Sequence, residues 1–278
     1  MSSDQMETVP APAWKHIALE LEAGLATVCL NRPEKHNSLS VPMLLELIDC
    51  ANWIGCNTHI RAVILKGNGP SFCSGMDLKA IMGGGLLRRA LAFLPLWKPT
   101  INRYQKVCLV WRSLSVPVIA VIQGNCFGAG LQLALGTDIR VADPASQFSI
   151  MESGWGLVPD MGGTVLLREL ISKDRAMELT LTGRVFNAEH ASRLGLVSHI
   201  ADDPLSVAEK LCDEIKRQSP DAVAAGKHLL HSAWSVSESS ALSLERLWQR
   251  RVIGRKNQRI AVERRLKNSD KNYDLRTW

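Results

Sequence analysis

Two stretches decide the fold of this chain: Ile122-Gln-Gly-Asn-Cys-Phe-Gly-Ala-Gly-Leu-Gln-Leu-Ala134 and Phe148-Ser-Ile-Met-Glu-Ser-Gly-Trp-Gly-Leu-Val-Pro-Asp-Met-Gly-Gly-Thr164. In the first, an apolar run enters a Gly-rich turn that opens a helical pattern. The first amides of a helix have no partner within it, so they can hold an anion. In the second, two carboxylates, Glu152 and Asp160, flank another Gly/Pro-rich turn. A holder for an anion beside two carboxylates indicates chemistry on an enolate.

Outside these stretches, short apolar runs alternate with helical patterns as far as Pro204. Two runs around Ala23-Gly24 predict a hairpin: Ile17–Leu21 and Leu25–Leu30. Further strands are expected at Ala62–Leu65, Val118–Ile122, Ile139–Ala142 and Val197–Ile200. A helix is expected over Met43–Trp53, with Ser40 as its N-cap and Pro42 in its first turn. This alternation predicts an α/β fold with a largely parallel sheet covered by helices.

After Pro204 the pattern becomes wholly helical. The expected helices are Ser206–Arg217, Asp221–Trp234, Leu242–Ile253 and Gln258–Lys267. Their apolar residues recur at helical spacing without a strand partner, so they must pack against the core or against a neighbouring subunit. We therefore expect a core over residues 14–203 and a C-terminal helical segment over residues 204–278.

The composition excludes several classes of protein. With 278 residues, 46% of them hydrophobic, the chain can bury one full core. No apolar run reaches the roughly 20 residues that span a bilayer, and the acidic N-terminus does not resemble a secretory signal. The seven cysteines are scattered without metal-ligand spacing, which indicates reduced, mostly buried thiols. These features predict a cytoplasmic protein with no membrane contact and no bound metal.

Positive charge gathers at the C-terminal end. Residues 246–278 contain 11 Lys and Arg against three acidic residues, a net charge of +8, whereas the whole chain carries +6. Such a segment either attracts phosphate groups or forms a solvated helix face, and both interpretations stay open.

Residues 83–99 form a separate feature. Three glycines, Gly83-Gly-Gly85, precede an apolar stretch that ends near Trp97. We interpret this region as a mobile lid over an apolar ligand, and a helix packed on the core is the alternative.

Four segments together resemble the crotonase (enoyl-CoA hydratase/isomerase) superfamily from about His16 to about Leu266. They are Asn31–Leu39, Phe72–Asp77, the Gly-rich turn that contains Gly128, and Glu152–Thr164, and their order and spacing match the family. The resemblance implies a crotonase-type repeated ββα spiral with largely parallel sheets, plus a C-terminal helical trimerisation segment that also closes the coenzyme A site. It also implies an acyl-CoA thioester as substrate, coenzyme A only as part of that substrate, and a homotrimer or a dimer of trimers.

The resemblance assigns roles to individual residues. The backbone amides of Met76 and Ala129 correspond to the donors that stabilise the enolate oxygen, and Gly128 lets the backbone approach the ligand. The remaining predicted substrate-binding residues are Lys35 and Ser38 near the adenine end, and Ser74, Asp77, Leu78 and Lys79 beside the pantetheine.

The acid–base residues separate two activities within the family. Hydratases of the family carry two glutamates, at the positions of Gln132 and Glu152, and an amide cannot accept a proton at neutral pH. We therefore place Gln132 among the substrate-binding residues. Asp160 matches an aspartate of the dienoyl-CoA isomerases, although those enzymes also carry an acid at the position of Gln132. Two carboxylates, one on each side of an acyl chain, can remove a proton at one carbon and return one at another.

We accordingly expect an enoyl-CoA or dienoyl-CoA isomerase of fatty-acid or related carboxylate metabolism. A hydratase that works with Glu152 alone is the first alternative. A crotonase-fold RNA-binding protein is a remote one, because no aromatic and basic recognition motif is present. Asp160 could instead cap a helix, and Glu152 could be structural if a cation paired with it.

Overall fold

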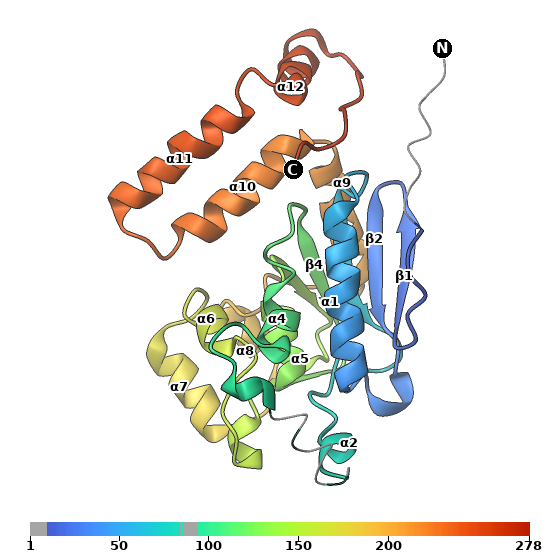
Figure 1. The fold of residues 1–278 in the computed structure, drawn as a ribbon, viewed down its shortest axis with the longest axis vertical. Coiled ribbons are helices and arrows are strands. Elements are labelled where there is room, and N and C mark those ends of the chain that lie inside the picture. Colours follow the sequence, from blue (N-terminus) through green and yellow to red (C-terminus); the bar gives the residue numbers. More distant parts are fainter. Residues whose placement is uncertain (1–9, 84, 86–89, 91–93) are drawn as a thin grey trace.

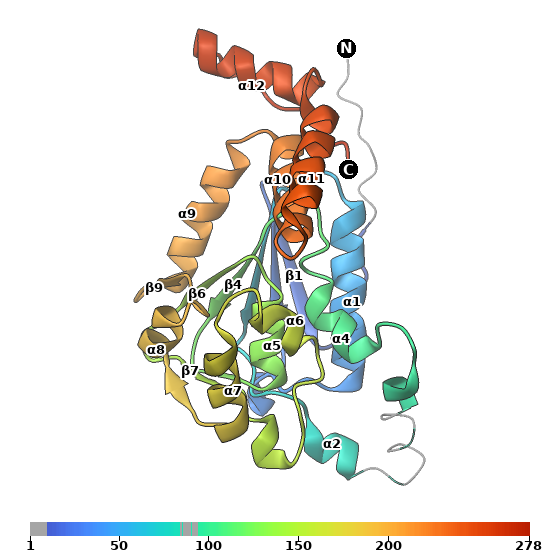
Figure 2. The ribbon, with the colours of Figure 1, turned by 90° about the vertical axis from the view of Figure 1, so that its left-hand side faces the viewer.

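A six-stranded sheet forms the centre of the molecule (Figures 1 and 2). The computed structural model describes residues 10–83, 85, 90 and 94–278. The strand order is β1-β2-β3-β4-β6-β9, and only β1 is antiparallel to its neighbour. The strands are β1 (Ile17–Glu22), β2 (Leu25–Leu30), β3 (Ala62–Gly67), β4 (Val118–Ile122), β6 (Ile139–Ala142) and β9 (His199–Ile200). All six coincide with predicted strands, so the predicted hairpin and the parallel sheet are confirmed.

A second, three-stranded sheet holds the two deciding stretches in place. It contains β5 (Asn125–Phe127), β7 (Gln147–Ser149) and β8 (Phe186–Asn187), in which β5 and β7 are parallel. The sequence pattern does not predict these strands, because two or three residues are too few to show a period of two. The pairing of β5 with β7 brings the Gly-rich turn after β5 beside the segment that leads to Glu152.

Helices cover both faces of the large sheet. Alternate residues of β3 point to opposite faces, so Val63 packs in the main core with α1 (Val41–Cys56), and Ile64 packs in a smaller core with α9 (Pro204–Lys216). Figure 2 shows the sheet between these two helices. Helix α1 begins as predicted, because the side chain of Ser40 accepts a hydrogen bond from the Met43 amide.

Shorter helices surround the second sheet and connect it to the first. The α-helices are α2 (Leu78–Met82), α4 (Arg103–Leu109), α5 (Ala129–Leu135), α6 (Gly163–Leu167), α7 (Lys173–Thr182) and α8 (Ala188–Arg193). The single 3-10 turns are η1 (Pro33–Lys35), η2 (Leu94–Trp97) and η3 (Glu152–Trp155). Mixed α/β layers with a mostly parallel sheet confirm the predicted fold class.

The C-terminal segment is helical, as predicted. It contains α10 (Pro220–Ala233), α11 (Glu238–Val252) and α12 (Lys256–Lys267), and α10 and α11 pack side by side above the sheet (Figure 1). Within the described chain, α11 buries none of its residues, and both Leu242 and Leu247 are exposed. Part of the apolar stripe of this helix is therefore exposed, although Trp248 stacks on His228 of α10 with ring centroids 5.3 Å apart.

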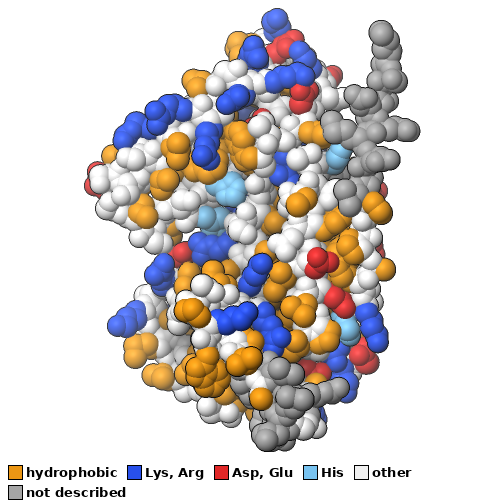
Figure 3. All heavy atoms as spheres, in the orientation of Figure 1, with side chains coloured by type: hydrophobic (Ala, Val, Ile, Leu, Met, Phe, Trp, Pro, Cys, Tyr) orange, Lys and Arg blue, Asp and Glu red, His pale blue; other side chains and the backbone are white. Residues whose placement is uncertain are grey.

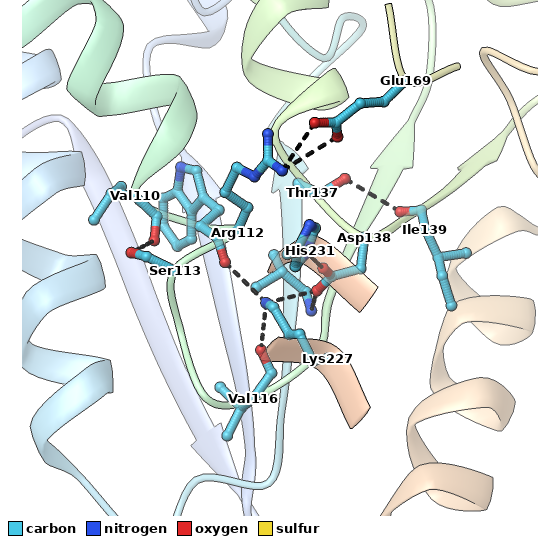
Figure 4. A network of polar contacts seen from close by, with 12 residues as sticks. Val110, Arg112, Ser113, Val116, Thr137, Asp138, Ile139, Glu169, Lys227 and His231 are labelled. Carbon is cyan, nitrogen blue, oxygen red and sulfur yellow. Dashed lines mark hydrogen bonds and ion pairs between the residues drawn. The ribbon is translucent and has the colours of Figure 1, made fainter. Parts of the chain in front are cut away.

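A buried polar network joins α10 to the sheet (Figure 4). Asp138, just before β6, accepts hydrogen bonds from Lys227 at 2.7 Å and His231 at 2.8 Å, and Lys227 also donates to the carbonyl groups of Trp111 and Val116. Burial alone would raise the pKa of Asp138, but the charge of Lys227 and the hydrogen bond from His231 hold it below its ordinary value. The network fixes the base of the C-terminal helices on the core.

The basic C-terminal segment has both a structural and an exposed part. Arg276 is buried and donates hydrogen bonds to the carbonyl oxygens of Gly55 and Asn57 at the end of α1, at 2.9 and 3.0 Å. Figure 3 shows further Lys and Arg side chains gathered on the surface over α11 and α12. The segment therefore carries both a buried positive charge and exposed ones.

Several other predictions can be compared with the structure. None of the seven cysteines forms a disulfide, and all except Cys56 are buried, as predicted. Among the described helices, none combines the length and the apolar composition needed to cross a membrane. The predicted lid over residues 83–99 lies in part outside the described residues, at 84, 86–89 and 91–93. Its described end, η2, carries Trp97, which is 77% exposed.

Candidate active site

A cavity of about 420 Å³ lies where the four family-like segments meet. Eleven of the twelve predicted site residues line it: Lys35, Ser38, Ser74, Met76, Asp77, Leu78, Lys79, Gly128, Ala129, Glu152 and Asp160. The twelfth, Gln132, does not line the cavity but lies behind Glu152. The fold thus gathers residues that are separated by more than a hundred positions in the sequence.

Two backbone amides in the cavity wall are free to bind an anion. The segment around Met76 lies parallel to Leu39, where the Leu39 amide bonds to the Gly75 carbonyl at 2.8 Å and the Asp77 amide bonds to the Leu39 carbonyl at 2.9 Å. Since alternate amides of an extended segment point in opposite directions, the amide of Met76 faces away from Leu39. Ala129 begins α5, so its amide has no partner within the helix. Within the described chain, neither amide has a hydrogen-bond acceptor.

Gly75 allows the two amides to approach each other. Its φ is +104°, and a Cβ atom there would lie 3.2 Å from the Phe127 carbonyl oxygen and 3.9 Å from the Ala129 nitrogen. Any side chain would therefore push the turn before Met76 away from the start of α5. The arrangement can place two N–H donors on one oxygen atom, as the stabilisation of an enolate requires.

Glu152 begins η3 at the side of the same cavity. Its side chain is only 9% exposed, and within the described residues it forms no ion pair. Its Oε1 accepts a hydrogen bond of 2.6 Å from Nε2 of Gln132, while its buried Oε2 has no partner in the described part of the chain. Burial raises the pKa of Glu152, and the nearby Asp160 raises it further. A buried carboxylate without a cation is typical of a proton-transfer site rather than of a structural ion pair.

Asp160 lies in the turn between η3 and α6 and reaches the cavity at its solvent-exposed side. The protein around it raises the pKa of Asp160 above its ordinary value through desolvation. The N-cap of α6 is Gly162, which has a φ of +90°. Asp160 therefore does not cap that helix, and the structural alternative considered from the sequence is wrong.

An arginine that the sequence pattern does not single out joins two loops of the cavity wall. Arg32 forms an ion pair of 3.0 Å with Asp77 and donates a hydrogen bond of 2.6 Å to the Ser38 carbonyl. Asp77 also caps α2 by accepting from the Ala80 amide at 3.1 Å. Asp77 therefore lines the cavity and also holds two loops together. Arg32 belongs to Asn31–Leu39, one of the four family-like segments.

Apolar side chains complete the cavity wall. Those not predicted from the sequence are Met151, Trp155, Leu157 and Met161, and the unpredicted polar residues are Glu34 and His36. Met151 and Met161 adjoin the two carboxylates in the sequence, and Trp155 and Leu157 lie between them, so proximity to the carboxylates was the available signal. An apolar wall next to the carboxylates suits the hydrocarbon part of a substrate.

Free amides opposite two carboxylates of raised pKa, on a mixed α/β fold, are the arrangement expected of enzymes that transfer protons next to a thioester carbonyl group. The family model for enoyl-CoA hydratase/isomerase matches residues 20–269. The chain belongs to the enoyl-CoA hydratase/isomerase family, which is the crotonase superfamily.

The chain is similar to proteins named as isomerases and to proteins named as hydratases. The chain is 33% identical to the 1,2-epoxyphenylacetyl-CoA isomerase of Escherichia coli over 239 residues, which cover 84% of this chain and 88% of that protein. It is 35% identical to the mitochondrial Delta(3,5)-Delta(2,4)-dienoyl-CoA isomerase of Rattus norvegicus over 224 residues, 76% of this chain and 68% of that one. The crystal structure of an enoyl-CoA hydratase from Bacillus anthracis superposes with a TM-score of 0.86 at 28% identity, covering 93% of this chain and 99% of that one.

Proposed function

We propose that this protein is an acyl-CoA isomerase that moves a double bond along an unsaturated acyl chain. The observation that carries the proposal is the presence of two carboxylates of raised pKa, Glu152 and Asp160, in one cavity with the free amides of Met76 and Ala129. A second carboxylate with raised pKa has no role in a reaction that needs one base, whereas it is required when a proton must be delivered to a distant carbon.

The proposed reaction starts with the thioester carbonyl oxygen held by the two amides. The Glu152 carboxylate removes a proton from C2 of a 3-enoyl thioester, and the electron pair spreads over the chain and onto the carbonyl oxygen. Each amide donor contributes about 2.7–4 kcal/mol to this step. Protonated Asp160 then gives its proton to C4, and the double bond lies between C2 and C3. The open side of the cavity lets solvent reset both carboxyl groups.

We also propose how the protein binds its thioester substrate and how copies of the chain assemble. Coenzyme A enters only as part of the substrate, against the loops that carry Lys35, Ser38 and Lys79. The core over residues 14–203 does the chemistry, and residues 204–278 close the coenzyme site and contact other copies in a homotrimer or a dimer of trimers. The exposed apolar residues of α11 and a cavity of about 510 Å³ beside α10 support this assembly. The unpaired thiols suit a reducing compartment such as the cytoplasm.

Incubation of the purified enzyme with 2-enoyl-, 3-enoyl- and 3,5-dienoyl-CoA thioesters tests the proposal. Ultraviolet absorbance follows the position of the double bond, and mass spectrometry distinguishes the two reactions. Isomerisation leaves the mass of the thioester unchanged, whereas hydration adds one water. Hydration as the main reaction would favour the alternative, a hydratase that relies on Glu152 alone.

The pH dependence of kcat/KM follows from the two raised pKa values. The pair must hold one proton in total, so activity falls at low pH when both carboxyl groups are protonated and at high pH when both are ionised. Because desolvation raises both pKa values, the acid limb lies at higher pH than it would for the same two carboxyl groups in water. A profile that is flat between about pH 4 and pH 8 would contradict a carboxylate pair.

Gln132→Glu tests what separates an isomerase from a hydratase at this site. The substitution restores the second glutamate of the hydratase pattern, so we expect some hydration of a 2-enoyl-CoA, measured as product heavier by one water. The gain stays small because Asp160 adds a further negative charge to the same site. If Gln132→Glu shows no hydration even with Asp160→Gly, the cavity differs from a hydratase site in more than these residues.

A further inference from the structure

Gln132 lies directly behind Glu152, in the middle of α5, and is only 3% exposed. Its carbonyl oxygen Oε1 accepts hydrogen bonds from the backbone amides of Met161 at 3.0 Å and Gly163 at 2.9 Å. Its Nε2 donates to Oε1 of Glu152 at 2.6 Å. One buried side chain therefore contacts both the base and the turn that follows Asp160.

The chemistry of the neighbours fixes the orientation of the Gln132 amide. Two backbone N–H groups require an acceptor, so the carbonyl oxygen must face Met161 and Gly163, and the NH₂ group must face Glu152. Because a donor then faces Oε1 of Glu152, that oxygen remains an acceptor. The unpartnered Oε2 is left as the site for a proton.

We propose that Gln132 is a positioning residue, which fixes the Glu152 carboxylate at the cavity wall through Oε1 and holds the Asp160 turn in register with it. The inference rests on the proposed isomerase function. Met161 directly follows Asp160, so a shift of Gln132 would displace both carboxylates at once. A misplacement of about 1 Å can cost about 100-fold in rate.

An amide satisfies all three neighbours of position 132 without a titratable proton. An ionised glutamate there would accept from the two backbone amides but could not donate to Glu152, and two ionised carboxylates so close together repel each other. A methionine would leave both backbone amides and Oε1 of Glu152 without partners. Gly163 fits this arrangement, because a Cβ atom there would lie 2.7 Å from Oε1 of Gln132.

Two substitutions of Gln132 separate its contact with Glu152 from its contacts with the turn after Asp160. Gln132→Glu keeps the acceptor for the turn and loses the donor to Glu152, while Gln132→Met loses both. Each variant is incubated with a 3-enoyl-CoA thioester in deuterated water over a range of pH. Deuterium at C2 of recovered substrate reports Glu152, and the 2-enoyl product reports Glu152 and Asp160 together. Gln218→Met, at an exposed position just after α9, is the matched control.

In Gln132→Glu the acid limb of C2 exchange should move to higher pH by about one unit or more, because the added carboxylate disfavours ionisation of Glu152. In Gln132→Met the limb moves in the same direction, because the lost hydrogen bond had lowered the pKa of Glu152. Isomerisation by this variant should fall by about 100-fold, and further than exchange does, because the Asp160 turn is also released. Acyl-CoA binding and the Gln218→Met control should match the wild type.

If Gln132→Glu keeps the wild-type acid limb and both variants isomerise at the wild-type rate, Gln132 does not position the carboxylates, although the isomerase function stands. Should Gln132→Met fail to fold, the shift in Gln132→Glu decides the question, because that variant keeps both bonds to the turn. If the wild-type enzyme neither exchanges C2 nor isomerises, the proposed function fails and the inference fails with it.

Discussion

Glu152→Gln is expected to lower kcat by about 100- to 10,000-fold, which is the usual loss when a general base is removed. The amide keeps the shape of the side chain and can still accept the hydrogen bond from Gln132 through its oxygen, so the fold and the affinity for acyl-CoA should persist. Turnover of a 3-enoyl-CoA and direct titration with a saturated acyl-CoA measure the two quantities separately.

Glu209→Gln is the matched control, because it makes the same change on the exposed side of α9 and should leave turnover unaffected. Stability provides a second check. Since folding raises the pKa of Glu152, the ionised form is disfavoured in the native state, so neutralising it should not lower the melting temperature at neutral pH. If Glu152→Gln retains more than about a tenth of wild-type kcat, Glu152 is not the base.

Asp160→Asn is expected to stop the delivery of a proton to the distal carbon while leaving C2 exchange intact. An asparagine cannot give up a proton at neutral pH, and the structure shows no capping bond to α6 that the change could break. In deuterated water the variant should incorporate deuterium at C2 of the recovered 3-enoyl substrate, and formation of 2-enoyl product should fall by about 100-fold or more.

This variant separates the isomerase from a hydratase that uses only Glu152, because the hydratase would lose little when Asp160 is changed. Isomerisation at the wild-type rate by Asp160→Asn would rule out the two-carboxylate mechanism and point to an enzyme with one base.

Five of the six strands of the large sheet could be predicted from the sequence because they are long enough to show an apolar run, as Val118–Ile122 does. The two-residue β9 could be predicted because it continues the apolar pair Leu196-Val197. The second sheet could not, since Phe186–Asn187 is only two residues long and forms a strand through its pairing with β7. Tertiary pairing, rather than local preference, determines such short strands.

A place in the cavity wall could be predicted for residues whose expected role depends on the backbone or on their own charge, such as Ala129 and Glu152. It could not be predicted where the role depends on which neighbour a side chain meets. Gln132 was expected against the substrate, but the fold turns it toward the backbone behind Glu152. Likewise, only the folded loops bring Arg32 to Asp77.

The most direct test of the two-carboxylate isomerase is the mass of the product formed from a 3-enoyl-CoA by the wild-type enzyme in deuterated water. We predict a 2-enoyl-CoA that contains no added water and carries deuterium at C4, because Asp160 lies at the solvent-exposed side of the cavity and exchanges its proton with solvent. A product heavier by one molecule of heavy water, or a 2-enoyl product without deuterium at C4, would contradict the account.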